Sequence, residues 1–293
     1  MYLTPLNVIL VVLVGTGTGI LGAILGVGGG VFLIPFLVLG FGVPMHYAVA
    51  TSIVSVIATS SAVASTNVER GTANMRLGMT LEVATSIGAI LGGLVSVWLS
   101  AHVLEGLFGL LLLPTAALMW RGRSPDGEND LELAEKGQPE IAEAAAEGNG
   151  SVPALGGQYY DEGEGRLVSY RVRRLPAGLA ISLAAGSVSG LLGVGGGIFK
   201  VPALHLLCDV PIKAAAATSN FMIGVTAAAS AFIYYGRGEV RPALSGATVI
   251  GVLLGSAAGS FLNRRVRGGQ IRRVFAVLLV AVAGQMWYRA LAG

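Results

Sequence analysis

The stretch "LGVGGGIFKVP", Leu192–Pro202, places three consecutive glycines and a lysine inside an apolar run. A second copy of the phrase, "LGVGGGVFLIP", occupies Leu25–Pro35. Each glycine in a helix interior costs about 1 kcal/mol relative to alanine. Both copies therefore predict a break in a helix that otherwise lies in apolar surroundings.

The composition of the chain predicts that those surroundings are a lipid bilayer. Hydrophobic residues make up 54% of the sequence, charged residues only 12%, and the mean hydropathy is +0.73. Soluble domains usually carry about 25% charged residues. Several apolar runs also reach the roughly 20 residues that a spanning helix needs. We therefore expect an all-α integral protein of the cell membrane.

The two glycine phrases belong to a repeat that covers most of the chain. An offset of 167 residues, from Leu25 to Leu192, keeps many identities in register without a gap. The matched stretches are Gly26–Gly30 with Gly193–Gly197, Val43-Pro44 with Val210-Pro211, Ala50–Ser52 with Ala217–Ser219, and Arg70-Gly71 with Arg237-Gly238. The sequence therefore predicts two homologous repeats, residues 1–120 and 177–293, joined by a polar insert at 121–176.

Each repeat divides into five apolar segments. They are residues 5–25, 28–42, 45–66, 77–99 and 104–120, then 177–192, 195–208, 212–235, 242–262 and 271–291. The second segment of each repeat is short and would fit either a span or a re-entrant hairpin. Five crossings per repeat place the arginine-rich stretch 264–273 and the insert on one face, as the positive-inside rule requires. The N-terminus then lies outside, the insert is cytoplasmic, and the odd count predicts inverted-topology repeats.

The insert differs from the rest of the chain in charge. It holds eleven acidic and seven basic residues, against five acidic and twelve basic residues elsewhere. We expect much of it to be disordered, but "GGQYYDEGEGRLVSYRVRR" (156–174) predicts a small β-hairpin. Two interpretations of the insert stay open: a linker between the repeats, or a part in regulation or in contact within a homodimer. The remaining arginines cluster at segment ends rather than on a soluble basic face, so nucleic acid is not an expected partner.

The glycine breaks are the candidate functional site. In lipid, broken helices persist only inside protein or along a wet cavity, and paired breaks in inverted repeats point to a transport site. The helix that restarts after each break presents backbone amides, which bind anions. Nearby hydroxyls could donate to the same anion, and a lysine buried at this depth needs a counter-charge. The candidate anion-binding residues are Gly28, Gly29, Gly30, Thr51, Ser52, Gly195, Gly196, Gly197, Lys200, Thr218, Ser219 and Asn220.

Other interpretations of these residues stay open. Lys200 could extend its amine to the membrane surface, and the hydroxyls could bond back to their own helix. Glu82 could relay protons or mark a solvated helix end. The many G-x-x-x-G spacings, such as Gly88/Gly92 and Gly186/Gly190, favour close helix packing rather than binding.

The sequence lacks the motifs of the common enzyme classes. It contains no H-E-x-x-H, G-x-S-x-G or Walker A pattern, which argues against a zinc protease, a serine hydrolase or an ATP-driven pump. Its single cysteine, Cys208, excludes an internal disulfide and a multi-cysteine metal site. We therefore expect a protein that is not an enzyme and that needs no cofactor or metal.

The duplicated phrase resembles the TauE/SafE family of sulfite exporters. The resemblance rests on Gly26–Pro35 with Val43-Pro44 and Ala48–Ser52, and on Gly193–Pro202 with Val210-Pro211 and Ala215–Asn220. It implies a secondary transporter that exports small sulfur-containing anions, such as sulfite or sulfoacetate, by alternating access. Two alternatives are a cation or metal permease and a membrane scaffold. Deletion of Asp126–Gly150 should spare a transporter and inactivate a scaffold.

Overall fold

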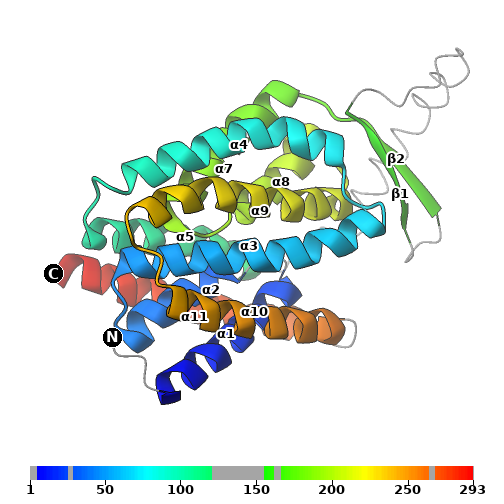
Figure 1. Cartoon of the computed structure of the whole chain (residues 1–293). Helices are drawn as coiled ribbons and strands as arrows, with labels where there is room; N and C mark the ends of the chain where they lie inside the picture. The colour runs from blue at the N-terminus through cyan, green and yellow to red at the C-terminus, as the bar shows by residue number, and fades with distance from the viewer. Residues whose placement is uncertain (1–4, 26–28, 121–154, 162–165, 264–267, 293) are drawn as a thin grey trace, which may run out of the picture.

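Ten α-helices, one π-helical turn and a two-stranded hairpin make up the part of the chain described by the computed structural model (Figure 1). The described residues are 5–25, 29–120, 155–161, 166–263 and 268–292. The first repeat contains α1 (Pro5–Leu25), α2 (Gly30–Pro35), η1 (Phe36–Gly40), α3 (Met45–Glu69), α4 (Met75–Val95) and α5 (Ala101–Trp120). The hairpin strands are β1 (Gly157–Asp161) and β2 (Arg166–Tyr170). The second repeat contains α7 (Leu175–Leu192), α8 (Gly197–Cys208), α9 (Ile212–Gly236), α10 (Pro242–Asn263) and α11 (Gly268–Ala292).

The predicted helical membrane architecture is confirmed. Each of the ten predicted apolar segments coincides with a helix, and the second of each repeat is short, as α2–η1 and α8. Within the described part of the chain, six helices are long and apolar enough to cross a bilayer: α1, α3, α4, α7, α9 and α10. The predicted hairpin is present as an antiparallel pair in which Tyr159 lies opposite Val168. The predicted disorder of residues 121–154 lies outside the described residues.

Proline, asparagine and glycine set the ends of the central helices. Pro44 and Pro211 precede α3 and α9 with extended ψ angles of 144° and 141°, which suits a residue just before the first helical turn. Asn74 caps α4, because its side-chain oxygen accepts a hydrogen bond of 3.0 Å from the Leu77 N–H group. At the far end of α7, Gly193 is left-handed and its N–H group bonds to Ser189.

The helix pairs that pack closely are related to one another by the sequence repeat. The helix α1 packs along α10, and α4 packs along α7. In the repeat, α1 is equivalent to α7 and α4 is equivalent to α10, so these two pairs are equivalent to each other. The pairs α3–α9 and α5–α11 each consist of two equivalent helices. The helices α3 and α9 lie side by side and run in opposite directions (Figure 1). This arrangement supports the expected inverted repeats, although the orientation of each repeat in a membrane stays a prediction.

Glycines allow these helix pairs to approach closely. A Cβ atom on Gly88 or Gly92 would collide with backbone oxygens of α7, and one on Gly186 or Gly190 with those of α4. The pair α1–α10 has the same design, since a Cβ atom on Gly251 would collide with the Val12 carbonyl. The packing role expected for the small-residue spacings is therefore confirmed at these positions.

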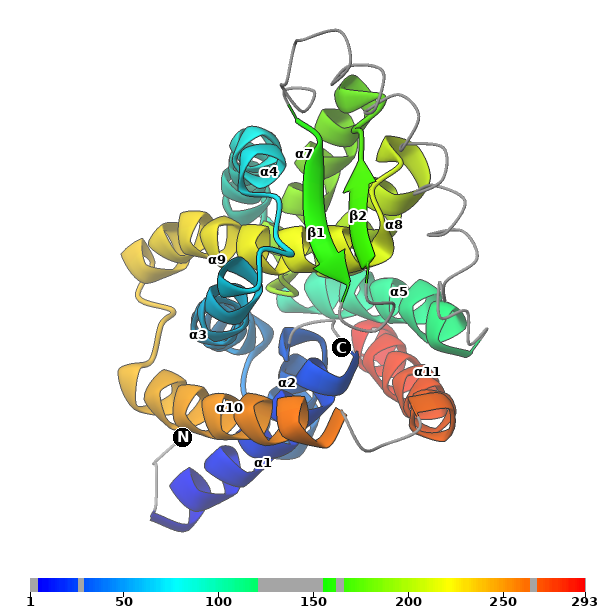
Figure 2. The same ribbon diagram turned by 90° about the vertical axis from the view of Figure 1, so that its right-hand side faces the viewer.

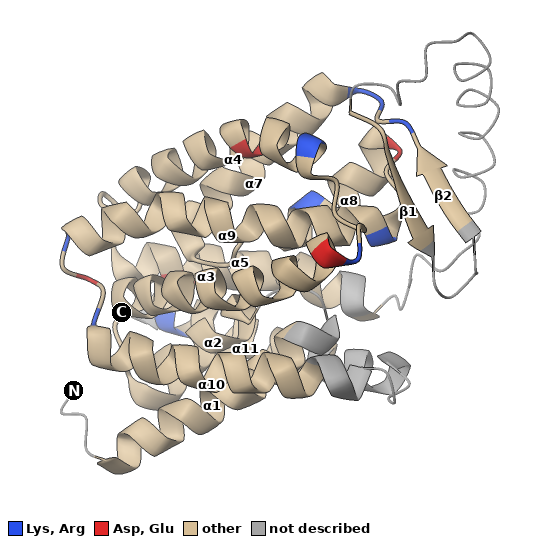
Figure 3. Cartoon of the chain, turned by 45° about the vertical axis from the view of Figure 1, so that its right-hand side comes forward, with Lys and Arg blue, Asp and Glu red and all other residues tan. Residues whose placement is uncertain are grey.

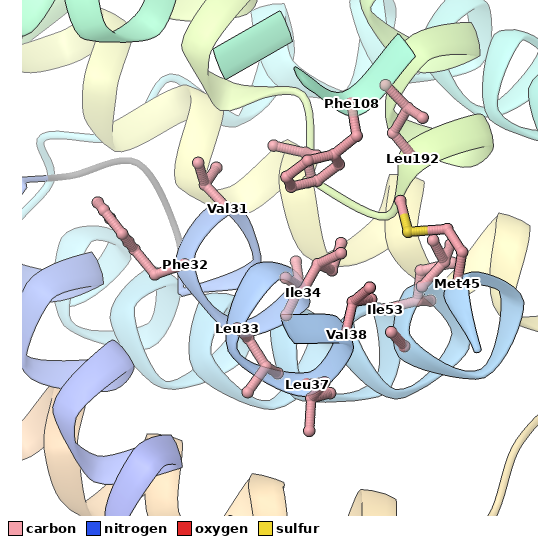
Figure 4. Close-up of a cluster of buried hydrophobic side chains, with 14 of the residues drawn as sticks. Val31, Phe32, Leu33, Ile34, Leu37, Val38, Met45, Ile53, Phe108 and Leu192 are labelled. Atoms are coloured by element: carbon pink, nitrogen blue, oxygen red, sulfur yellow. The ribbon is translucent and has the colours of Figure 1, made fainter. Parts of the chain in front are cut away.

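The short segments α2 and η1 lie inside the bundle. Val31, Leu33, Ile34 and Leu37 are fully buried, and the cluster around them is drawn in Figure 4. It also includes Met45 and Ile53 of α3, Phe108 of α5 and Leu192 of α7. All six residues of α2 are buried, whereas Phe36 at the start of η1 is 39% exposed, so α2 is the part of this segment that is enclosed by protein.

The hairpin lies across one end of the bundle (Figure 2). Its Tyr159, Val168 and Tyr170 join a buried cluster with residues of α4, α8 and α9, among them Leu81 and Leu204. Charged residues lie mainly at this end and at the opposite end of the bundle, with few in between (Figure 3). The hairpin is therefore packed onto the helices rather than hanging free from them.

We predict that Gly88→Ala lowers the thermal stability of the protein in detergent. The added methyl group would overlap the Leu183 carbonyl of α7, and overpacking typically costs about 1–3 kcal/mol. The matched control is Gly284→Ala in α11, where no atom lies within 4 Å of the new Cβ. Alanine is the better helix former, so the control should keep or slightly raise the melting temperature. Equal melting temperatures for both variants would contradict this account of the α4–α7 contact.

Candidate functional site

The second glycine phrase interrupts the helix as predicted. Helix α7 ends at Leu192 and α8 begins at Gly197. Between them Gly193, Gly195 and Gly196 have φ angles of +68°, +81° and +69°, values that side chains other than glycine seldom adopt. All three glycines are buried, so the break lies inside protein, where irregular backbone is tolerated in membranes.

The first copy begins a helix at the equivalent residue. Gly30 is the first residue of α2 and corresponds to Gly197, while Gly29 precedes it with a right-handed φ of −62°. The predicted site residue Gly28 lies outside the described residues. Gly29 and Gly30 are both buried, so the described part of this phrase also lies within the protein.

The two glycine phrases meet in the middle of the molecule. Ser52 of α3 donates a hydrogen bond of 2.8 Å to the carbonyl of Gly193 in the other repeat. A Cβ atom on Gly30 would lie 2.6 Å from the Ser52 oxygen and 2.9 Å from that same carbonyl. Only a glycine fits between them. The sequence separation of 141 residues is thus closed by a direct contact between the repeats.

A serine hydroxyl lies beside the start of each restarted helix. In the first repeat this is Ser52 beside Gly30. In the second it is Ser219 beside Gly197, where a Cβ atom would lie 3.6 Å from the Ser219 oxygen. The hydroxyls of Thr51 and Ser219 are buried and make no hydrogen bond within the described residues. Buried polar groups without partners are uncommon and call for an explanation such as a ligand.

Two of the predicted site residues have a different environment. The Thr218 hydroxyl accepts a hydrogen bond of 2.9 Å from the backbone N–H group of Asn74. The Asn74 side chain in turn donates to the Tyr170 hydroxyl at 3.1 Å, so Thr218 is tied to the hairpin end of the bundle. Asn220 is half-buried. Sequence reasoning grouped both residues with Ser219; the hydrogen bond of Thr218 is made to Asn74 rather than to the glycine turn, and the role of Asn220 stays a prediction.

Lys200 is buried one turn into α8. Its side chain is 1% exposed, so the alternative in which its amine reaches the membrane surface is wrong. The Nζ atom donates a hydrogen bond of 2.8 Å to the Thr226 hydroxyl of α9. A Cβ atom on Gly196 would lie 3.6 Å from the Lys200 Cε atom, which places the lysine directly against the glycine turn.

Glu82 of α4 accompanies this lysine. The interpretation of Glu82 as a solvated helix end is wrong, because the residue is only 4% exposed. Its Oε1 atom accepts hydrogen bonds from Thr226 at 2.8 Å and from Ser86 at 3.0 Å. Its Oε2 atom lies 4.0 Å from the Lys200 Nζ atom. The site thus contains a lysine and a carboxylate bridged by one hydroxyl.

Sequence reasoning did not connect Lys200 with Glu82, although a signal was present. At the equivalent positions the first repeat has Leu33 for Lys200, and the second repeat has Val249 for Glu82. The pair Lys200–Glu82 is therefore charged, whereas the equivalent pair Leu33–Val249 is apolar. Because buried charges in membranes pair with each other, this joint difference could have identified the ion pair.

The sequence of the chain is similar to that of a known protein family. The sequence profile of the family described as "Sulfite exporter TauE/SafE" matches residues 11–286, nearly the whole chain. The chain belongs to this family. The match spans both repeats and both glycine phrases, as the resemblance predicted.

Curated relatives are similar to the chain over nearly its whole length, at low sequence identity. The chain is 25% identical to the probable membrane transporter protein YunE of Bacillus subtilis, over 98% of this chain and 99% of that protein. It is 26% identical to a probable membrane transporter protein of Xylella fastidiosa, over 96% of each chain. A probable membrane transporter protein of Methanocaldococcus jannaschii is 24% identical, over 94% of this chain and 92% of its own length. No solved structure matches the chain.

The family match and the names of these relatives support a membrane transporter. A transporter has to bind its substrate where both sides of the membrane can reach it in turn, and paired helix breaks are a recurrent solution. The buried contact between Gly30, Ser52 and Gly193 joins the two breaks. The region around Lys200 and this contact is the candidate site.

Proposed function

We propose that the protein is a secondary transporter of small sulfur-containing anions, such as sulfite or the organosulfonate sulfoacetate, working by alternating access between inverted repeats. The family description supports this substrate class. The observation that carries the proposal is the buried Lys200 beside the glycine turn at the start of α8. A buried cation, the backbone amides at the start of a helix and hydroxyl donors together suit a small oxyanion.

The proposed anion contacts come from both repeats. Gly195, Gly196 and Gly197 would present backbone amides, with Gly28–Gly30 in the equivalent role. Thr51 and Ser219 would supply the two buried hydroxyls that lack a hydrogen bond within the described residues. Lys200 would supply the positive charge. Ser52, Thr218 and Asn220 would shape the surroundings, since the first two already have structural partners.

A cation permease is the weaker alternative. Such a protein needs carboxylates or thiolates that are free to bind the ion. The two buried carboxylates of the described membrane helices each lie close to a protein cation. Glu82 lies 4.0 Å from Lys200, and Glu105 lies 3.6 Å from Arg289. Both carboxylates are thus already compensated by positive charge.

We predict that sulfite or an organosulfonate stabilises the purified protein against thermal unfolding, while the chloride salt of the same cation at equal ionic strength does not. A ligand present at about 100 times its dissociation constant adds about 2.7 kcal/mol to the stability of the state that binds it. The measurement is a thermal-shift series with sulfite, sulfoacetate, taurine, thiosulfate and sulfate.

The control for this series is the variant Thr51→Val/Ser219→Ala, which removes both unpaired hydroxyls and retains their approximate volume. Its melting temperature without ligand should stay near that of the wild type, because no protein hydrogen bond is lost. Its ligand-induced shift should be smaller. An undiminished shift would remove these hydroxyls from the proposed site, and stabilisation by divalent cations alone would favour the permease.

A further inference from the structure

The pair Lys200–Glu82 has a property that anion binding alone does not explain. The structure places one negative charge beside the lysine before any substrate arrives, so the pair is neutral as a unit. Thr226 links the two groups, accepting from the Lys200 Nζ atom and donating to the Glu82 Oε1 atom, both at 2.8 Å. This pattern of hydrogen bonds is compatible with a charged lysine and an ionised carboxylate.

A substrate anion at Lys200 would therefore compete with Glu82. Two negative charges against one positive charge leave a net negative charge in a buried site, and an uncompensated buried charge is severely unfavourable. The conflict disappears when Glu82 takes up a proton. The charge on Lys200 is then available to the anion. A site loaded with a monovalent anion is neutral again, and one loaded with a divalent anion such as sulfoacetate carries one negative charge instead of two.

The hydrogen bonds of Glu82 leave one carboxylate oxygen able to take up a proton. Oε1 is occupied, since it accepts hydrogen bonds from Thr226 and Ser86. Oε2 is buried and has no hydrogen bond within the described residues, so a proton can be added there without breaking one. The Thr226 hydroxyl has a second acceptor, the Met222 carbonyl, also at 2.8 Å. It can turn to that carbonyl when the charge on Glu82 is lost.

Among the described residues, no other charged group lies beside Glu82. Helix α4 packs against α7 and α9, and α7 carries no titratable side chain. Among the described residues, Lys200 is the one charge that acts on Glu82. The other titratable side chains of α8 and α9 are His205, Cys208, Lys213, Tyr234 and Tyr235. His205 and Tyr234 contact backbone carbonyls, Lys213 and Tyr235 are exposed, and Cys208 packs with the hairpin cluster. Tyr159 and Tyr170 of the hairpin pack at the Asn74 end of α4, and Tyr160 is exposed.

We propose that Glu82 is a proton-binding site, and that one proton is taken up at its Oε2 atom for each anion that binds beside Lys200. The proton comes from the aqueous side to which the site is open, forms an O–H bond, and leaves to the other side with the anion. The protein is then an anion–proton symporter. This inference rests on the proposed function and adds its coupling ion.

The proposal has a direct test in proteoliposomes. The probe is sulfoacetate, whose carboxyl group is ionised well above pH 4, so that the probe itself carries no proton. A pH-sensitive dye inside the vesicles reports proton movement, and valinomycin with potassium clamps the membrane potential. An inward sulfoacetate gradient should acidify the lumen by one proton per anion in the wild type. Binding should weaken by up to about tenfold for each pH unit above the range in which Glu82 is protonated.

Two variants complete the test. Glu82→Gln cannot take up the proton, so sulfoacetate entry should no longer acidify the lumen. The matched control is Glu239→Gln, which changes another buried carboxylate, one paired with Arg237 at 2.7 Å in the loop between α9 and α10. Burial raises the pKa of Glu239, so this residue also titrates above its usual range. Proton movement should nevertheless persist in the control.

The outcomes separate the two proposals. Sulfoacetate flux without lumenal acidification in the wild type would overturn proton coupling and leave the anion transporter standing, and this result needs no variant. Unchanged acidification in Glu82→Gln would assign the proton to another group. If neither sulfite nor sulfoacetate moves at all in the wild type, the proposed function fails and the coupling proposal fails with it.

Discussion

Replacing Lys200 by leucine should reduce the initial rate of sulfoacetate flux in proteoliposomes by about 100-fold or more. Removing one partner of a buried charge pair costs about 3–5 kcal/mol, and each 1.4 kcal/mol corresponds to about tenfold in an equilibrium constant. The variant would lose the positive charge for the substrate and leave Glu82 buried without its cation. Flux of labelled sulfoacetate, normalised to reconstituted protein, measures the effect.

The first repeat supplies a control for the stability of this variant. Leu33 and Val249 occupy the positions equivalent to Lys200 and Glu82, so Lys200→Leu/Glu82→Val would copy an apolar pair that the protein already contains. Buried ion pairs are often replaced by apolar residues without loss of stability. We expect the double variant to unfold at or above the wild-type temperature and still to transport nothing. Transport near the wild-type rate in either variant would exclude Lys200 from the site.

Gly196→Leu should likewise abolish transport, through the shape of the backbone rather than through charge. Gly196 has φ of +69°, where a side chain costs about 1–2 kcal/mol. The new Cβ would lie 3.1 Å from the Ala185 carbonyl and 3.6 Å from the Lys200 Cε atom. The side chain would therefore fill the space between the glycine turn and the lysine. Binding of sulfoacetate and its flux should both be lost.

The control for Gly196→Leu distinguishes backbone strain from steric crowding. Gly238 has nearly the same φ, +70°, but no atom lies within 4 Å of a Cβ built there. Gly238→Leu should lower stability to a similar degree and keep transport. If Gly238→Leu is as inactive as Gly196→Leu, backbone strain alone explains the loss, and the glycine turn has no special place in the mechanism.

The fold could be predicted from the sequence to within a few residues at most helix ends. Hydrophobic length identified the membrane helices, the 167-residue repeat identified equivalent elements, and prolines such as Pro44 and Pro211 marked where α3 and α9 begin. The π-helical turn η1 at Phe36–Gly40 was not predicted. Its hydrogen bonds depend on local packing around a short buried segment, and no residue pattern is specific to it.

The site was predicted less completely, for a physical reason. A backbone break follows from local composition, so the turn at Gly193–Gly196 was foreseen. A buried ion pair depends on which helices lie together, so Glu82 on α4 and Thr226 on α9 were missed as partners of Lys200. The same limit explains Thr218, whose neighbour Asn74 comes from a different helix. Contacts between side chains of different helices can be predicted only when the packing of those helices is known.

The contact between Asn74 and Thr218 also links the hairpin to the membrane helices. Asn74 bonds at once to the Tyr170 hydroxyl, to the Leu155 carbonyl and, through its backbone, to Thr218 next to Ser219. The hairpin is consequently hydrogen-bonded to the residue that caps α4. We expect a displacement of β2 to be felt at the first turn of α4, the helix that carries Glu82, the partner of Lys200.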